Sequence, residues 1–259
     1  MSKLFYNAIC CFAMGAILLS SCGEKRATEN ALSETENTLS ESSNTLSESE
    51  KAEGWTLLFD GTTTDGWHLY NRGEVPSAWV VRNGELACLP ADSSLGIEHG
   101  DLVSDKEYEN YDLRFEWKIS EAGNSGVFIN VIEREDLPKA WVSGPEYQLL
   151  EDTNPDFAAD EKKRAGCLYG FYPQKNDAPT QPLGEWNQSR ITQENGKIEF
   201  YLNDILTAEE DFNTEAWKEL VANSGFKTYP EFGKATKGRI GLQDWSKGIS
   251  FRNIKIKEL

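Results

Sequence analysis

The chain has 259 residues, with 43 acidic and 26 basic side chains and a formal net charge of −17 at pH 7. Such an acidic surface excludes nucleic acid as an expected partner, because binding to phosphates needs a stripe of basic side chains. The charge favours solubility and ligands that are neutral or cationic.

The first 22 residues have the pattern of a bacterial export signal. Lys3 is the only charged residue before an apolar stretch from Ala8 to Leu19, and this stretch is too short to cross a bilayer of about 30 Å as a helix. The sequence Leu19-Ser-Ser-Cys22 resembles a lipobox, where lipoproteins are cleaved and acylated. We expect a signal peptide over residues 1–21, lipidation of Cys22 and a place in the cell envelope, on the periplasmic face or the cell surface. The protein would then contact the membrane through its lipid anchor only. The alternative is an ordinary secretory signal in which this Cys is incidental.

Two cysteines remain in the mature chain under this interpretation. Cys10 and Cys11 are removed with the signal and Cys22 carries lipid, which leaves Cys88 and Cys167. An exported compartment permits a disulfide, but the sequence does not give the distance between the two sulfur atoms. A disulfide and two buried free thiols therefore stay equally open.

Few residues in the sequence are suited to bind a metal. The chain has no CxxC motif and no Cys/His cluster, and His68 and His99 are its only histidines. We therefore expect neither a zinc site nor a Ser-His-Asp triad. Oxygen ligands could hold Ca²⁺, but no loop has a recognisable spacing for it. No cofactor is predicted, and Ca²⁺ stays open.

A Ser/Thr/Asn/Glu-rich segment separates Cys22 from the rest of the chain. Leu32, Leu39 and Leu46 recur every seven residues within it. A coiled coil needs two apolar positions per heptad, and this repeat has one. We therefore expect residues 22–53 to be a lipidated Cys followed by a disordered acidic tether, with a coiled coil as the alternative.

About 205 residues remain, from 54 to 259, which suits one all-β sandwich domain. Residues 111–119 alternate strictly between apolar and charged side chains, as a half-buried strand does. Similar stretches predict strands at 55–59, 78–82, 126–132, 146–150, 189–193, 197–202, 238–243 and 249–256. Hairpin turns are predicted at Asn83-Gly84, Asn195-Gly196 and Asn203-Asp204. One helix is predicted over 214–222 with Thr214 as N-cap. The fold class is thus a β-sandwich or jelly roll with long loops at 133–145 and 152–188, which we expect to shape a binding site.

A group of polar side chains falls on the outward face of the predicted strands. In a strand over 146–150, Tyr147 and Leu149 face the core, while Glu146 and Gln148 face outward. By the same alternation, the outward-facing residues of the segment 239–245 are Arg239, Gln243 and Trp245. If both strands belong to one sheet, these side chains share a face with Glu146. A plain solvated face is the alternative.

Aromatic residues with polar neighbours accompany these strands. They are Trp141, Tyr169, Trp186 with Asn187, and Trp245. Aromatic faces that stack on sugar rings, next to carboxylates and amides, are typical of a carbohydrate site. The competing interpretation is that these rings belong to the core.

The chain from 54 to 259 resembles the 3-keto-disaccharide hydrolase domain family. The resemblance rests on motifs that occur in order along the chain: Gly54-Trp-Thr-Leu-Leu-Phe-Asp-Gly61 with Gly66-Trp67, Trp79-Val-Val-Arg-Asn-Gly-Glu-Leu86, Glu107-Tyr-Glu-Asn-Tyr-Asp-Leu-Arg-Phe-Glu-Trp117, Gly123-Asn-Ser-Gly-Val-Phe128, Gly144-Pro-Glu-Tyr-Gln-Leu-Leu-Glu-Asp152, Leu168-Tyr-Gly170, Gly184-Glu-Trp-Asn187, Gly238-Arg-Ile-Gly-Leu-Gln-Asp244 and Phe251-Arg-Asn-Ile-Lys-Ile-Lys257. It implies a concanavalin-like jelly roll, a carbohydrate ligand and action on glycosides that are oxidised at C3. Members often carry His after the Gln-Asp pair, and this chain has Trp245 there.

Cleavage of a 3-keto-glycoside needs a base, an acid and groups that bind the sugar. The hypothesis is that Glu146 is the acid or the base, with Asp152 or Asp244 as its partner. The expected substrate-binding residues are Asn124, Gln148, Tyr169, Trp186, Asn187, Arg239, Gln243 and Trp245. One alternative is a laminarinase-type glycoside hydrolase, since Glu146-x-Gln148-x-x-Glu151 is similar to the motif of those enzymes. The other is a surface lipoprotein that binds glycans without catalysis.

Overall fold

Strands predicted from alternation form most of the protein. The computed structural model describes residues 43–259 except 74, 93 and 95; the predicted signal, Cys22 and most of the predicted tether lie outside the described residues. Strand β6 (Tyr111–Ile119) has its predicted limits. All five of its apolar side chains are buried, because this strand is central in its sheet.

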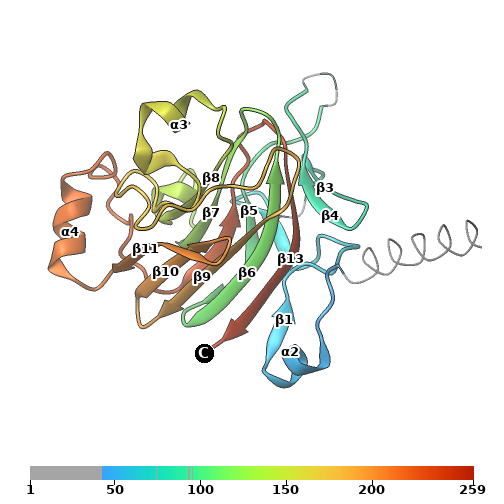
Figure 1. The fold of residues 1–259 in the computed structure, drawn as a ribbon, viewed down its shortest axis with the longest axis horizontal. Coiled ribbons are helices and arrows are strands. Elements are labelled where there is room, and N and C mark those ends of the chain that lie inside the picture. The colour runs from blue at the N-terminus through green and yellow to red at the C-terminus, as the bar shows by residue number, and fades with distance from the viewer. Residues whose placement is uncertain (1–42, 74, 93, 95) are drawn as a thin grey trace, which may run out of the picture. The chain divides into compact units, whose positions relative to one another are not determined.

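Two antiparallel sheets make up the described chain (Figure 1). The eight-stranded sheet has the order β11 (Ile205–Asp211), β10 (Lys197–Leu202), β9 (Asn187–Glu194), β6, β13 (Ile249–Glu258), β4 (Glu85–Cys88) and β3 (Trp79–Arg82), with β1 (Trp55–Leu57) also paired to β13. The five-stranded sheet has the order β2 (Trp67–Leu69), β5 (Leu102–Tyr108), β12 (Gly238–Leu242), β7 (Asn124–Val131) and β8 (Glu146–Leu150).

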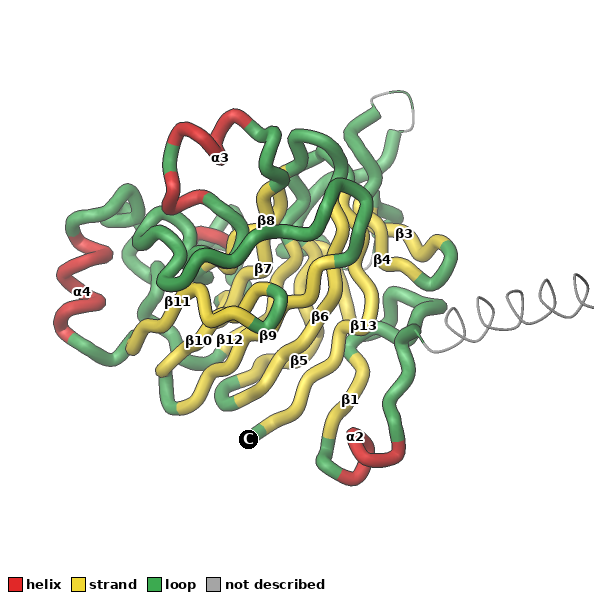
Figure 2. Tube along the Cα trace, viewed as in Figure 1, coloured by secondary structure: helices red, strands yellow, loops and turns green. Residues whose placement is uncertain are grey.

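The two sheets pack face to face over an aromatic core (Figure 2). Tyr147 of β8 reaches across to the other sheet, with its ring centroid 5.8 Å from Phe115 and 5.0 Å from Phe200. Its buried hydroxyl is 2.8 Å from Ser189 Oγ and donates to the Tyr201 carbonyl at 3.0 Å, so burial leaves no unpaired group there. This packing confirms the predicted all-β sandwich.

The predicted turns and helix are also confirmed. Both residues of each Asn-Gly and Asn-Asp pair have positive φ, from 48° to 77°, as two-residue hairpin turns require. Helix α4 (Glu215–Ala222) begins after Thr214, whose hydroxyl accepts a hydrogen bond from the Trp217 amide at 3.1 Å. The remaining helical segments are short: α2 (Glu48–Ala52), η1 (Ala140–Val142), α3 (Pro155–Ala159) and η2 (Glu161–Lys163). Among the described residues, no helix has the length and hydropathy to span a membrane.

The folded domain begins earlier than the sequence predicted. Asn44 is buried. Its backbone amide donates to the side-chain oxygen of Asn253 in β13 at 2.6 Å, and the backbone amide of Asn253 donates to the side-chain oxygen of Asn44 at 2.8 Å. The Asn44 side chain also donates to the Gly84 carbonyl at 2.8 Å. A capping box formed by Ser47 and Glu50 starts helix α2. The prediction of a disordered tether up to residue 53 is therefore wrong for residues 43–53, because polar side chains there hold the chain to β13.

Candidate active site

The outer face of the five-stranded sheet carries the predicted acid. Tyr147 and Leu149 of β8 lie in the core between the sheets, so Glu146 and Gln148 face away from it. Glu146 is nevertheless buried, and Gln148 is almost completely buried. Gln148 donates to Asn124 on the neighbouring strand β7 at 3.4 Å. The structure thus brings three of the predicted residues together.

The absence of a side chain at Gly126 on β7 leaves room for the Glu146 carboxyl group. Gly126 is paired with Gln148 in the strand register, and the Glu146 side chain lies over it. A Cβ atom on Gly126 would be only 2.0 Å from Oε1 of Glu146. A glycine at this position is therefore required for the carboxyl to lie against the sheet.

Gln243 joins this group from the end of β12. Its backbone amide donates to the Gly126 carbonyl at 2.9 Å, and its side chain is close enough to the Glu146 carboxyl to lower the pKa of that group. The Gln243 Oε1 atom is buried and has no hydrogen-bond partner among the described residues. Buried acceptors are normally satisfied, so this oxygen lacks the donor that its position calls for.

A second carboxyl, that of Asp101, lies in the electrostatic range of Glu146. Burial raises the pKa of Glu146 well above its ordinary value, and the negative charge of Asp101 raises it further, against the hydrogen bond from Gln243. Burial also raises the pKa of Asp101 to about 6, although the Asp244 and Ala140 amides donate to it. Both carboxyl groups therefore hold a proton more tightly than an ordinary carboxyl group does.

Each of the two long loops has residues near this region. Residues 166–169 run along the free edge of β8, where the Gly166 amide donates to the Gln148 carbonyl at 2.8 Å and the Tyr169 amide donates to the Glu146 carbonyl at 3.0 Å. Asp101 opens into a pocket of about 110 Å³, which is lined by Tyr70, Arg72, Lys139 and neighbouring residues. Asp101 is thus reached from this pocket, whereas Glu146 and Gln243 are not among the residues that line it.

The comparisons with known proteins bear on the whole domain. The family model described as the 3-keto-alpha-glucoside-1,2-lyase-like domain matches residues 54–257. The chain belongs to this family.

Individual proteins with known names or solved structures are also similar to this chain. The chain is 31% identical to a 3-keto-disaccharide hydrolase of Bacteroides thetaiotaomicron, over the full length of both chains. It is 32% identical to a crystallised candidate glycosyl hydrolase of Parabacteroides distasonis, with a TM-score of 0.75 and coverage of 84% of this chain and 99% of that chain. A second such structure from the same organism, at 24% identity and a TM-score of 0.60, shows the shared fold and covers 79% of this chain and 99% of its own. Family membership and the first relative confirm the expected glycosidase-type hydrolase.

Asp244, predicted as a partner of Glu146, is close to the pair but already engaged. Its side chain is buried, and it accepts hydrogen bonds from His99 Nδ1 at 2.7 Å and from the Gly100 and Ser246 amides at 3.0 and 2.8 Å. Asp101 is therefore better placed than Asp244 to act with Glu146. Trp245, the next residue, is 56% exposed, which leaves its ring free to contact a ligand.

Four predicted site residues lie away from Glu146: Asp152, Asn187, Trp186 and Arg239. Asp152 follows the end of β8 and accepts a hydrogen bond from Thr180 at 3.2 Å. Asn187 and Asp152 line the same pocket, which has a volume of about 210 Å³. The side-chain oxygen of Asn187 accepts a hydrogen bond from the Gln181 backbone amide at 2.7 Å. Asp152 and Asn187 are therefore not brought to Glu146.

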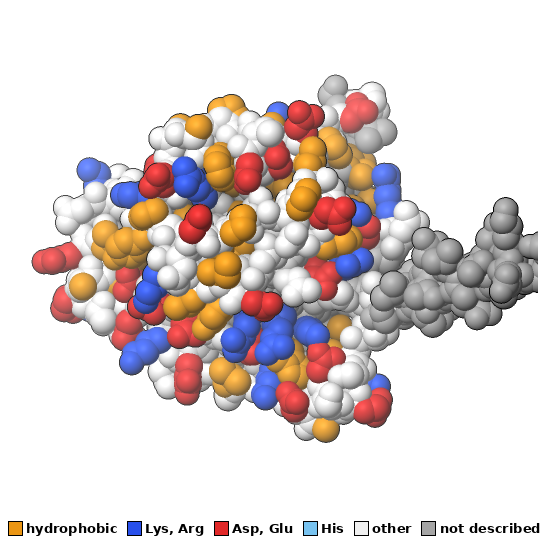
Figure 3. Space-filling model, viewed as in Figure 1, with side chains coloured by type: hydrophobic (Ala, Val, Ile, Leu, Met, Phe, Trp, Pro, Cys, Tyr) orange, Lys and Arg blue, Asp and Glu red, His pale blue; other side chains and the backbone are white. Residues whose placement is uncertain are grey.

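Trp186 makes cation–π contacts with two basic side chains of the eight-stranded sheet. The Lys118 ammonium and the Arg252 guanidinium lie 4.6 and 4.2 Å from its ring centre. Figure 3 shows a group of basic side chains on the lower part of the face turned to the viewer. The ring thus packs on the outer face of the eight-stranded sheet, on the opposite side of the core from Glu146.

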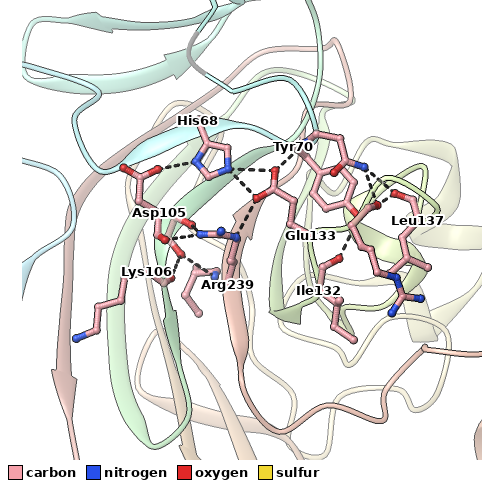
Figure 4. A network of polar contacts seen from close by, with 12 residues as sticks. His68, Tyr70, Asp105, Lys106, Ile132, Glu133, Leu137 and Arg239 are labelled. Carbon is pink, nitrogen blue, oxygen red and sulfur yellow. Dashed lines mark hydrogen bonds and ion pairs between the residues drawn. The ribbon is translucent and has the colours of Figure 1, made fainter.

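Arg239 belongs to a separate network on the five-stranded sheet (Figure 4). Its guanidinium pairs with Glu133 at 2.9 Å and donates to the Ser104 carbonyl at 2.8 Å. His68 bonds to the same Glu133 at 2.8 Å and to Asp105 at 2.5 Å. A register shift in β12 between Arg239 and Gly241 separates this network from Gln243. Arg239 therefore has a structural set of partners rather than the predicted sugar contact.

Asp101 and His99 were missed by sequence reasoning. Both precede β5, a strand that the sequence did not predict. The available signal was weak: a Gly flanked by His and Asp immediately before the apolar pair Leu102-Val103. Cys88 and Cys167 are both buried free thiols, so the alternative without a disulfide holds.

Proposed function

We propose that this domain cleaves glycosides that carry a ketone at C3 of the sugar, by elimination across C1 and C2 followed by addition of water. The relative named a 3-keto-disaccharide hydrolase and the family description support the substrate class. The observation that carries the proposal is the interaction of the buried Glu146 carboxyl with the partly buried Asp101 carboxyl, next to the unpaired acceptor of Gln243. Such pairs with separated protonation states assign an acid and a base.

The ketone makes the hydrogen on C2 acidic. The base removes this proton, and the electron pair forms an enolate across C2 and C3. The enolate then restores the C3 ketone as a double bond forms between C1 and C2, and the C1–O bond breaks. The leaving oxygen takes a proton from the acid. Water adding across C1=C2 gives the free 3-keto-sugar.

The two carboxyl groups have complementary roles in this scheme. Glu146, whose pKa is raised, keeps its proton and donates it to the leaving oxygen. Asp101, the ionised partner, accepts the proton from C2. In this scheme Gln243 and Tyr169, which lie beside Glu146, orient the sugar, and the exposed Trp245 ring stacks on it.

A specific observation weighs against the laminarinase-type alternative. Its second acid would be Glu151, but this carboxylate accepts hydrogen bonds from the Ala122 and Thr153 amides at 2.8 and 3.0 Å. Burial acts to raise the Glu151 pKa, yet these hydrogen bonds outweigh it and the pKa is lowered. Glu151 therefore holds a turn, and Glu146 lacks a second acid on its own strand.

The deciding experiment follows the C2 hydrogen. A disaccharide and its 3-keto form are incubated with the protein in D₂O, and early product is analysed by mass spectrometry. We expect release from the 3-keto form only, with one deuterium at C2. Release from the unmodified sugar without deuterium would identify a conventional glycosidase. Release from neither, with binding retained, would identify a binding protein.

Variants test the residue roles in the same assay. Glu146→Gln and Asp101→Asn are each expected to lower kcat by 10²-fold or more, on the order of a lost acid or base. Glu151→Gln is the matched control, and it should keep kcat near that of the parent. Undiminished turnover by Glu146→Gln would remove this residue from the mechanism.

We also propose that the domain is held in the cell envelope by acyl chains on Cys22. The Leu19-Ser-Ser-Cys22 pattern supports this. Cells that express the chain are grown with labelled palmitate, and the label should enter the protein. Cys22→Ala should abolish labelling, and equal labelling of this variant would refute the anchor.

A further inference from the structure

A cysteine, a histidine and an aspartate converge at one end of the sandwich. Cys88 ends β4 of the eight-stranded sheet, His99 precedes β5 of the other sheet, and Asp244 follows β12. One ligand atom from each side chain lies within 4.8 Å of the other two. The three side chains are far apart in sequence, and the packing of the two sheets brings them together.

We infer that Cys88, His99 and Asp244 form a binding site for a divalent transition metal of the zinc type. A thiolate, an imidazole and a carboxylate are the ligand types that Zn²⁺ prefers, and two anionic ligands balance its charge. Metal–ligand bonds of about 2.0–2.3 Å separate neighbouring ligand atoms by roughly 3.5 Å. The three groups therefore need only a small inward movement to close on an ion.

The hydrogen bonds around the cluster leave room for this role. His99 Nδ1 is 2.7 Å from Asp244 Oδ2, so these two atoms share a proton in a hydrogen bond. A metal ion bound by both atoms would replace this proton. The Nε2 atom of His99 is buried without a hydrogen-bond partner among the described residues. This imidazole is thus not fully satisfied by the protein, although buried ring nitrogens normally are.

The geometry favours a metal over a nucleophilic Cys-His-Asp triad. In a triad, the acid and the nucleophile contact opposite nitrogens of the imidazole. Here the Cys88 thiol donates to the Leu89 carbonyl at 3.9 Å, and Nε2 of His99 has no hydrogen-bond partner among the described residues.

The ligand set also selects against hard cations. Ca²⁺ and Mg²⁺ take oxygen ligands, and two of the three ligand atoms here are sulfur and nitrogen. The site goes beyond the proposed acid and base, because neither Glu146 nor the C2 chemistry is needed for the ion to bind. Its test is therefore a binding measurement, whose outcome is independent of turnover.

Cobalt(II) is the probe, because a thiolate ligand gives it a near-ultraviolet charge-transfer band. The purified full chain is stripped with chelator and titrated with Co²⁺, and Zn²⁺ is then added as competitor. We expect one equivalent of Co²⁺ to produce the thiolate band and Zn²⁺ to abolish it. A large excess of Ca²⁺ should leave the band unchanged.

The chain supplies a matched control for each ligand type. Cys88→Ser should remove the charge-transfer band, whereas Cys167→Ser, which changes the other buried thiol, should keep it. His99→Asn should weaken Co²⁺ binding more than 100-fold, since even groups behind the ligands change affinity by about 10–100-fold. His68→Asn should leave affinity unchanged.

Three results would overturn the site. They are the absence of a thiolate band in the parent chain, a band that persists in Cys88→Ser, and a band that depends on Cys167. Circular dichroism melts of each variant show that it is folded before titration. If Cys88→Ser does not fold, Asp244→Asn takes its place, and unchanged Co²⁺ affinity in that variant would equally refute the site.

Discussion

The substitution Gly126→Ala would move the Glu146 carboxyl group without changing its chemical identity. The new Cβ atom would lie 2.0 Å from Oε1 and 2.6 Å from Cδ of Glu146, whereas real Cβ atoms essentially never approach another heavy atom within 3.0 Å. The carboxyl group must therefore retreat by about 1 Å, and a shift of this size can lower a rate by about 10²-fold. We expect kcat on a 3-keto-disaccharide to fall by about 10²-fold, which corresponds to about 2.7 kcal/mol of transition-state free energy.

The stability of Gly126→Ala should change much less. The atoms that must move belong to the end of a side chain, so the strand backbone can stay in place. Overpacking a core typically costs about 1–3 kcal/mol, and replacing Gly by Ala in a strand returns about 0.5–1 kcal/mol. We expect the free energy of unfolding to fall by less than about 2 kcal/mol in a urea titration.

Gly225→Ala is the control for this substitution. A Cβ atom at Gly225 meets no heavy atom within 4 Å, so both kcat and stability should match the parent. Parent-like kcat in Gly126→Ala would refute the argument that the carboxyl must lie against the sheet. A loss of stability equal in size to the loss of activity would show that the glycine serves the fold instead.

Three further predictions concern other features of the molecule. The pKa of Glu146 is raised in the folded state, so the parent should lose stability as the pH rises from the unfolded-state pKa near 4.5 through the folded-state pKa. Glu146→Gln should lack this loss, so the Tm of the variant minus that of the parent should grow with pH. Parallel curves of Tm against pH would contradict this prediction. Asn44→Ala should lower the free energy of unfolding by about 1–3 kcal/mol, because it leaves buried partners unpaired, while exposed Lys51→Ala should change it by less than about 0.5 kcal/mol in the same urea titration. Trp245→Ala should leave Tm unchanged, since the ring is 56% exposed, but should raise KM about tenfold, equal to about 1.4 kcal/mol of lost stacking; an unchanged KM would remove this ring from substrate binding.

Local patterns predicted the strands that carry them. The alternation of residues 111–119 gave β6 its limits, and the Asn-Gly and Asn-Asp pairs marked hairpins correctly. Strand β5 was missed because three consecutive exposed residues, 105–107, break its alternation where the pairing with β12 shifts register. Strands β2, β4 and β11 were missed as well, and two of them are short, with three residues in β2 and four in β4.

The candidate site was predictable only in part, because it depends on contacts between distant segments. Glu146, Gln148 and Gln243 were found because strand alternation assigns them to an outward face. No local pattern connects Asp101 with Glu146, or His99 with Asp244, which is 145 residues away. Trp186 was misplaced because an aromatic ring that stacks on sugars has the same composition as one that stacks on Lys and Arg.

The position of β13 has a consequence for how the chain reaches its native state. This last strand lies between β6 and β4 and also pairs with β1, near the beginning of the described chain. The larger sheet therefore cannot be completed until residues 249–258 are available, because they connect β6, β4 and β1. Fragments that lack this segment should remain open and sensitive to protease.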